Sequence, residues 1–145
     1  MEKIKFGNTT VLDMGSGTGI LAILAKKVGS TAVDAIDIEE WAFENMKENF
    51  ERNEVQVNAY FGGVGVLQSL SENYEVIIAN INKNILLSQF AVYNQKLKNK
   101  GDLLLSGFYE VDADDLLQAP ELNGYSELNR IIKDGWCALH LKKNG

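Results

Sequence analysis

The hydrophobic positions of this 145-residue chain fall into short runs of two kinds that alternate along its length. Runs such as 9–14 and 74–81 are continuous and rich in Val, Ile or Leu, which predicts buried strands. Between them, apolar residues recur at helical spacing, as in 18–29, where Thr18 is positioned to cap the helix and Gly29 to end it. We therefore predict alternating strands and helices, with no internal repeat.

The same patterns predict a helix at 39–54, further strands at 31–38, 55–61 and 102–109, a short helix or turn at 65–73, and a long helix at 83–101 that Gly101 ends. A broken helix is expected at 112–124 around Pro120, the only proline. The last runs, 125–134 and 136–143, are separated by too few residues for a crossover helix, so they should pair antiparallel. Five strand–helix units and a terminal hairpin predict an α/β fold with a doubly wound, mostly parallel seven-stranded sheet and helices on both faces.

Composition sets broad limits on this picture. With 46% hydrophobic and 23% charged residues, the chain is typical of a globular protein, and we expect a single domain spanning 1–145. Residues 1–8 lack the apolar core of a signal peptide, and no apolar run approaches the ~20 residues of a membrane helix. The single Cys137 excludes an internal disulfide. We therefore expect a cytoplasmic protein with no membrane association.

The net charge of −6 bears on partners. Proteins that bind the phosphate backbone normally present a basic face, so direct binding of nucleic acid is disfavoured. Mild acidity is compatible with a basic protein partner, although it also serves solubility alone.

The stretch VLDMGSGTGIL, 11–21, is the most informative part of the chain because Gly15, Gly17 and Gly19 follow a predicted strand at every second position. A tight strand-to-helix turn needs one glycine, whereas three suggest that a ligand lies against bare backbone. In open α/β sheets, ligands bind at this end of the strands. The loop therefore predicts a ligand site.

The identity of that ligand is constrained by the spacing. A dinucleotide fingerprint places its third glycine at position 20, where this chain has Ile20, and no Gly-Lys-Ser/Thr of a P-loop is present. A nicotinamide-dependent oxidoreductase is therefore a weaker alternative. Asp13 favours a cation over a pyrophosphate near the loop. The pattern resembles the S-adenosylmethionine loop of class I methyltransferases.

Two further positions extend the predicted site. Asp37 ends the second strand, where a carboxylate can accept hydrogen bonds from both ribose hydroxyls; the alternative is a cap for the following helix. Ile38 would then present an apolar face to the adenine. Asn80 is expected at the carboxyl end of the fourth strand, where its amide oxygen could accept hydrogen bonds from an amine nucleophile. Asn82 and Asn84 follow at a helix start, and at least one of these three asparagines should act as a cap or turn residue. No metal site is expected.

Beyond these motifs, most of the chain resembles the ribosomal protein L-eleven methyltransferase (PrmA) family, in segments that occur in the expected order at 11–29, 35–49, 79–87, 103–109 and 135–143. The resemblance implies a Rossmann-like class I fold and methyl transfer from S-adenosylmethionine to lysine and N-terminal amines of a ribosomal protein. It implies that Asn80 lies at the methyl-transfer site. The cofactor positions implied by the resemblance, with the loop residues between them, are Asp13, Gly15, Ser16, Gly17, Thr18, Gly19, Asp37, Ile38 and Asn80.

Two departures from the family accompany this resemblance. Full-length members carry an N-terminal substrate-recognition domain, which we expect this chain to lack. The adenine-side loop of the family commonly reads Gly-Asp, whereas this chain has Gly62-Gly63, so we expect weaker cofactor binding. Two alternatives therefore stay open. One is a cofactor-binding module without activity. The other is a nucleic-acid amino-methyltransferase, although its usual Asn/Asp-Pro-Pro-aromatic motif is replaced here by the sequence at 80–83.

Overall fold

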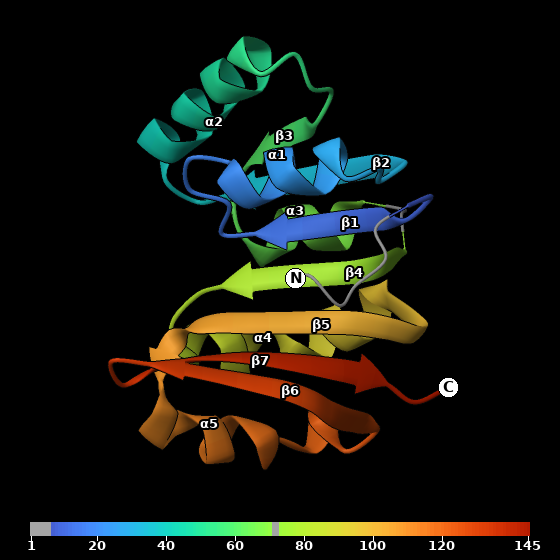
Figure 1. Ribbon diagram of the computed structural model, residues 1–145, viewed down its shortest axis with the longest axis vertical. Helices are drawn as coiled ribbons and strands as arrows, with labels where there is room; N and C mark the ends of the chain where they lie inside the picture. The colour runs from blue at the N-terminus through green and yellow to red at the C-terminus, as the bar shows by residue number, and fades with distance from the viewer. Residues whose placement is uncertain (1–6, 71–72) are drawn as a thin grey trace.

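The computed structural model describes residues 7–70 and 73–145, which form one seven-stranded sheet with helices packed against it (Figure 1). The strand order is β3-β2-β1-β4-β5-β7-β6, with β1 to β5 parallel and β7 antiparallel to both β5 and β6. The predicted fold class is confirmed. The elements in chain order are β1 Thr10–Met14, α1 Ile20–Lys27, β2 Ala32–Asp37, α2 Glu40–Arg52, β3 Asn58–Phe61, α3 Val64–Ser69, β4 Tyr74–Asn80, α4 Lys83–Lys96, β5 Leu97–Tyr109, α5 Glu110–Leu117, the 3-10 turn η1 Pro120–Leu122, β6 Tyr125–Lys133 and β7 Trp136–Lys143.

Some sequence expectations fall on parts of the chain that are not described. The argument that residues 1–8 lack a signal peptide rests mostly on residues 1–6, which lie outside the described residues. Residues 71–72, in the predicted short helix or turn at 65–73, also lie outside them. Among the described residues, no helix combines the length and apolar composition needed to cross a membrane.

The strands alternate their apolar side chains between two cores. On one face, residues such as Leu12, Ile77 and Leu103 pack against α3, α4 and α5. On the other face, residues such as Val11 and Ile78 pack against α1 and α2. Both faces of the central strands are therefore buried, which explains their continuous apolar sequence.

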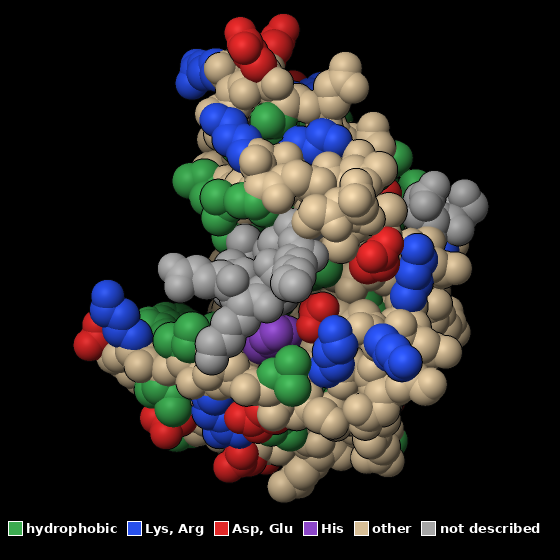
Figure 2. Space-filling model, turned by 45° about the vertical axis from the view of Figure 1, so that its right-hand side comes forward, with side chains coloured by type: hydrophobic (Ala, Val, Ile, Leu, Met, Phe, Trp, Pro, Cys, Tyr) green, Lys and Arg blue, Asp and Glu red, His purple; other side chains and the backbone are tan. Residues whose placement is uncertain are grey.

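The sheet is covered unevenly on the α1 side. Figure 1 shows α1 in front of the upper strands, whereas no described helix lies in front of β5, β7 and β6. On that part of the face Leu104 and Ala138 are half-buried and Ile131 is exposed. His140, the single histidine, lies there too (purple in Figure 2), and its Nε2 is 2.8 Å from Asp102 Oδ1. Residues of this face on β5, β6 and β7 share a hollow with Asn80, at the strand ends where the site was predicted.

The predicted helix 83–101 is too long, because α4 ends at Lys96 and β5 begins at Leu97. The termination comes from the last strand: the Lys143 ammonium donates hydrogen bonds to the carbonyls of Asn94 at 2.7 Å and Leu97 at 2.9 Å. These carbonyls lie at the helix end and lack helical partners. A contact across the sheet, rather than Gly101, therefore ends the helix.

The start of α1 also differs from the prediction. Gly19, at φ 83°, occupies the cap position, and no side chain caps the helix; the Thr18 carbonyl instead accepts a hydrogen bond from Asn49 of α2 at 2.8 Å. The end of this helix is as predicted, with Gly29 just beyond it at φ 108°. The predicted break around Pro120 is confirmed by η1.

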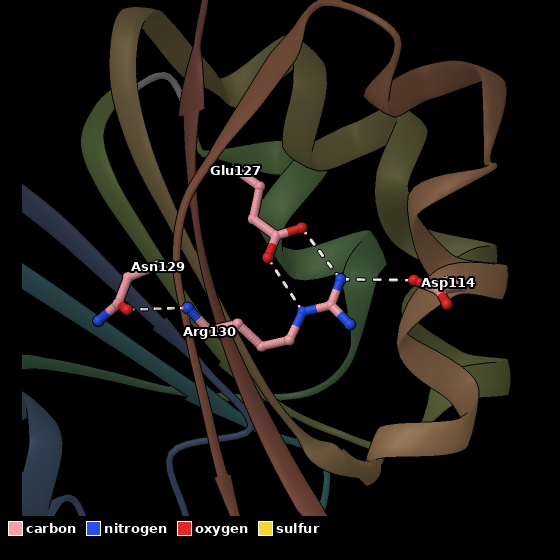
Figure 3. A network of polar contacts seen from close by, with 4 residues as sticks. All are labelled: Asp114, Glu127, Asn129 and Arg130. Atoms are coloured by element: carbon pink, nitrogen blue, oxygen red, sulfur yellow. Dashed lines mark hydrogen bonds and ion pairs between the residues drawn. The ribbon is translucent and has the colours of Figure 1, made fainter.

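The edge strand β6 is tied to α5 by Arg130 (Figure 3). Its guanidinium donates to both carboxylate oxygens of Glu127 at 3.0 Å and contacts Asp114 of α5 at 3.4 Å. Asn129 Oδ1 accepts from the Arg130 amide at 3.0 Å. Of these contacts, the Arg130–Asp114 pair joins β6 to α5, which begins directly after β5.

We expect Lys143→Met to lower the free energy of unfolding by about 1–3 kcal/mol, because two helix-end carbonyls lose a charged donor. Urea denaturation measures the change, and Lys133→Met on the exposed hairpin is the matched control. Equal stability of Lys143→Met and the control would show that the helix end does not depend on this ammonium.

Candidate functional site

The glycine loop joins β1 to α1 and is bonded to the neighbouring strand β2. The amides of Gly15 and Ser16 both donate to the Ile36 carbonyl, at 2.8 and 3.0 Å. Gly15, Gly17 and Gly19 all have positive φ, which L side chains rarely adopt. The loop is thus held in a backbone conformation that the three glycines make accessible.

The glycines differ in what surrounds them. A Cβ atom at Gly19 would lie 2.6 Å from Phe50 Cε1, so this glycine is required by packing against α2. A Cβ atom at Gly17 would meet nothing within 4 Å, so this part of the backbone faces open space. Backbone that a ligand could approach is therefore present at Gly17, whereas Gly19 serves packing against α2.

Asp37 connects the loop to the end of β2. Its Oδ2 accepts from the Gly17 amide at 2.8 Å and its Oδ1 accepts from the Glu39 amide at 2.9 Å. The side chain is 8% exposed. Because each carboxylate oxygen carries two acceptor positions, each retains capacity for one further donor, such as a ribose hydroxyl. The two sequence interpretations are therefore compatible, since one carboxylate can order the turn before α2 and still accept from a ligand.

Asp13 lies beneath the loop and is 1% exposed. Ser16 Oγ donates to its Oδ2 at 2.8 Å, whereas its Oδ1 is buried with no hydrogen-bond partner among the described residues. Burial raises the pKa of Asp13 to about 6, with a smaller contribution from the Asp37 charge in the same direction. A buried carboxylate with an unpaired oxygen favours a nearby cation or donor, which fits a ligand that carries an ammonium group.

Asn80 stands exposed at the end of β4, and the glycine loop lies beside it. A Cβ atom at Gly15 would be 3.6 Å from the Asn80 carbonyl oxygen and 2.9 Å from Ile81 Cγ1. Asn82 caps α4 through a 3.1 Å hydrogen bond from the Ile85 amide to its Oδ1. The expectation that at least one of the three asparagines is a cap is therefore confirmed for Asn82.

Three strand ends thus meet: Gly15 and Gly17 follow β1, Asp37 ends β2 and Asn80 ends β4. Two predicted site residues, Thr18 and Ile38, make no described side-chain contact with this group of strand ends. The Thr18 backbone is bonded to α2, and Ile38 is 69% exposed. Ile38 does lie beside the adenine-side loop of the sequence analysis, since a Cβ atom at Gly63 would be 3.6 Å from Ile38 Cδ1.

Gly107 is a site residue to which the sequence analysis gave no role. It lies at φ 91° where the β5–β7 register shifts, and a Cβ atom there would be 2.8 Å from both Asn80 Oδ1 and the Ile81 amide nitrogen. Gly107 thereby lets β5 pass close to the Asn80 side chain. The available signal was an isolated glycine inside a strand pattern, which suggests a bulge or a close backbone approach.

A hollow of about 500 Å³ opens beside Asn80, on the side of the sheet that no described helix covers at β5, β7 and β6. Its lining includes Gly107, Ile131, Lys133, Trp136 and Cys137. Cys137 is a buried free thiol, and its burial raises the pKa of the thiol. Within residues 7–70 and 73–145, no three acidic, histidine or cysteine side chains lie together as a metal site would require.

The fold and this arrangement of strand ends define a class I methyltransferase domain. A crystal structure of ribosomal protein L11 methylase from Lactobacillus delbrueckii subsp. bulgaricus matches with a TM-score of 0.88 at 26% identity, covering 99% of this chain and 74% of that one. The tRNA m1G37 methyltransferase of M. jannaschii matches with a TM-score of 0.82 at 22% identity, covering 99% of this chain and 47% of that one, which shows the shared fold alone.

The family model described as Ribosomal protein L11 methyltransferase (PrmA) matches residues 1–144, and the chain belongs to this family. A Ribosomal protein L11 methyltransferase from Porphyromonas gingivalis is 43% identical over 89% of this chain and 44% of its own length. One from Ruminiclostridium cellulolyticum is 33% identical over 98% of this chain and 46% of its own length. The chain spans less than half the length of these relatives.

We expect Gly107→Ala to destabilise the protein by about 2–3 kcal/mol, because it adds a clash with Asn80 and Ile81 to the strain of a positive φ. Gly135→Ala is the matched control: its φ of 85° is similar, but a Cβ atom there meets nothing within 4 Å. Urea denaturation compares the two variants. If they are equally stable, backbone strain alone explains the glycine at position 107.

The raised pKa of Asp13 has a consequence for stability. The folded protein keeps this proton up to about pH 6, whereas the unfolded chain loses it near 3.8, so the free energy of unfolding falls by about 3 kcal/mol as pH rises between these values. Asp13→Asn lacks this dependence. Relative to the wild type, the variant should therefore gain about 3 kcal/mol between pH 4 and pH 7 in urea denaturation. Asp134→Asn, at the exposed hairpin turn, is the control, and a difference for Asp13→Asn that does not vary with pH would contradict the assignment.

Proposed function

We propose that this chain is the catalytic part of an S-adenosylmethionine-dependent N-methyltransferase whose acceptor is an amine of a ribosomal protein. Three lines support the proposal: membership of the L11 methyltransferase family, the names of the relatives, and the meeting of Gly17, Asp37 and Asn80 at adjacent strand ends. The observation that carries most weight is the Gly17–Asp37 contact, because it joins bare backbone to a carboxylate with spare acceptor capacity. A ribosomal protein substrate would make the enzyme cytoplasmic.

The residues present fit S-adenosylmethionine. In this proposal Asp37 accepts hydrogen bonds from the ribose hydroxyls, and the open backbone at Gly17 lies against the cofactor. The buried Asp13 provides negative charge for the ammonium group of the cofactor. When bound, the cofactor supplies an electrophilic methyl group attached to a sulfonium. The exposed Ile38 offers an apolar surface for the adenine.

Asn80 then acts on the acceptor. A free lysine has a pKa near 10.4, so presenting it as a neutral amine at pH 7 costs about 4–5 kcal/mol. The Asn80 amide oxygen accepts an N–H of the amine, which orients the nitrogen lone pair for in-line attack. Among the described residues that line the hollow there is no carboxylate or histidine to act as a base, and burial raises the pKa of the Cys137 thiol. The proton therefore leaves to water.

The function is tested by two variants with opposite effects. We expect Asp37→Asn to weaken S-adenosylmethionine binding by more than about tenfold in calorimetry, because the ribose loses a charged acceptor. Asn80→Ala should retain cofactor affinity but lower methyl transfer by roughly a hundredfold, because the amine loses its orienting acceptor. Transfer is measured by mass spectrometry of ribosomal protein L11 incubated with the chain and cofactor.

Glu40→Gln is the control for the first variant, since it removes one negative charge from the exposed start of α2. NAD is the control ligand. Tighter binding of NAD than of S-adenosylmethionine would overturn the cofactor assignment. Cofactor binding by the wild type without transfer to the ribosomal protein would instead identify a binding module.

A further inference from the structure

Two large aromatic side chains are stacked in an exposed position near Asn80. Tyr109 ends β5 and Trp136 begins β7, and the two residues are direct partners in the sheet register. Their ring centroids lie 4.2 Å apart with an interplanar angle of 23°. The residues remain 50% and 49% exposed, respectively. The stack therefore holds two rings rigidly while leaving a large part of their surface free.

The stack stands between two hollows. Trp136 lines the hollow that also contains Asn80, Ser106 and Gly107. Trp136 and Tyr109 together line a second hollow, of about 470 Å³, along with Asn82 and other residues at the start of α4. A group that leaves Asn80 along this surface would therefore meet an aromatic ring.

The charged side chains that line the second hollow are one carboxylate and one ammonium, so its lining carries no net charge. Asp112 lines it, and Glu110 follows Tyr109 at the start of α5. Lys83 is an opposing cation, but it contacts Asp112 at 3.6 Å and Asp115 at 2.8 Å, so two carboxylates offset its charge. Lys133, opposite Trp136 in the hairpin, is the remaining cation at this end of the sheet among the described side chains that line the two hollows.

We propose that the Tyr109–Trp136 stack binds the ammonium group of the acceptor once it carries methyl groups, and so favours repeated methylation of the same amine. This inference rests on the proposed function. An alkylammonium is attracted to the face of Trp or Tyr within about 6 Å of the ring centroid. Each added methyl group leaves the positive charge in place but replaces an N–H that water would solvate. Affinity for the aromatic surface should therefore rise with methylation, and a partly methylated amine stays beside Asn80.

The first test measures binding without cofactor or catalysis. In a Trp41→Phe background Trp136 is the only tryptophan, so its fluorescence reports on the stack. The probe is an amide-capped trimethyl-lysine, compared with capped lysine and with a neutral analogue in which carbon replaces the quaternary nitrogen. We expect saturable quenching by the trimethyl probe and about fivefold weaker binding of the neutral analogue.

Variants then assign the binding to the stack. By ligand-observed NMR, Trp136→Ala and Tyr109→Ala should each weaken binding of the trimethyl probe by about fivefold, with urea denaturation checking that both variants fold. Trp41→Ala is the matched control, because Trp41 is an exposed tryptophan on α2. Equal affinity for the charged and neutral probes, or unchanged binding in Trp136→Ala, would overturn the proposal.

The outcomes separate this inference from the proposed function. Methyl transfer to the ribosomal protein with no preference for the trimethyl probe would overturn the stack's role and leave the enzyme assignment standing. Binding of the trimethyl probe by a chain that fails to bind S-adenosylmethionine would support the ammonium site while removing the enzyme assignment. Where both hold, mass spectrometry should show Trp136→Ala shifting products toward lower methylation states.

Discussion

The hydrogen bond from the Gly17 amide to the Asp37 carboxylate is the constraint on which the site depends, because it joins the ends of β1 and β2. The Ile36 carbonyl strengthens the same connection by accepting from two consecutive loop amides. A loop with three positive φ values has few local reasons to keep one conformation. Its conformation is therefore imposed by β2, so the backbone surface offered to a ligand is prepared by the sheet.

The arrangement of the loop also has an unfavourable free-energy contribution, which comes from Asp13. A carboxylate buried beneath the loop with one unpaired oxygen is unfavourable in the folded protein, as its raised pKa reflects. Unfavourable electrostatics of this kind are common at functional sites, where a ligand supplies the missing charge or donor. The strain of the site and its proposed affinity for a cationic group thus have one origin.

On the other side of the site, contacts from the C-terminal strands shape what the central strands present. Gly107 lets β5 approach Asn80, and Trp136 of β7 brings an aromatic ring to the hollow beside it. In the proposed function, the antiparallel hairpin therefore contributes to the acceptor side, whereas the parallel strands β1 and β2 contribute the cofactor side. This division follows from the sheet order, in which β4 lies between the two groups.

Sequence reasoning was accurate where a local pattern has one structural solution. Alternating apolar runs predicted the strands, and Asp37 ends β2 as predicted. Sequence reasoning was wrong at Thr18 and at 97–101. Gly19 rather than Thr18 occupies the cap position of α1, and α4 ends at Lys96, where the Lys143 ammonium of the last strand donates to carbonyls at the helix end.

By itself, the sequence determined the order of the elements, the sheet class and the place of the glycine loop, because these follow from periodicity and from the conformational freedom of glycine. Only the tertiary structure decided which glycine faces open space, that Asp13 Oδ1 is buried without a hydrogen-bond partner among the described residues, and that Tyr109 meets Trp136. Each of these depends on atoms brought together from strands distant in the chain, and no local pattern encodes such distances.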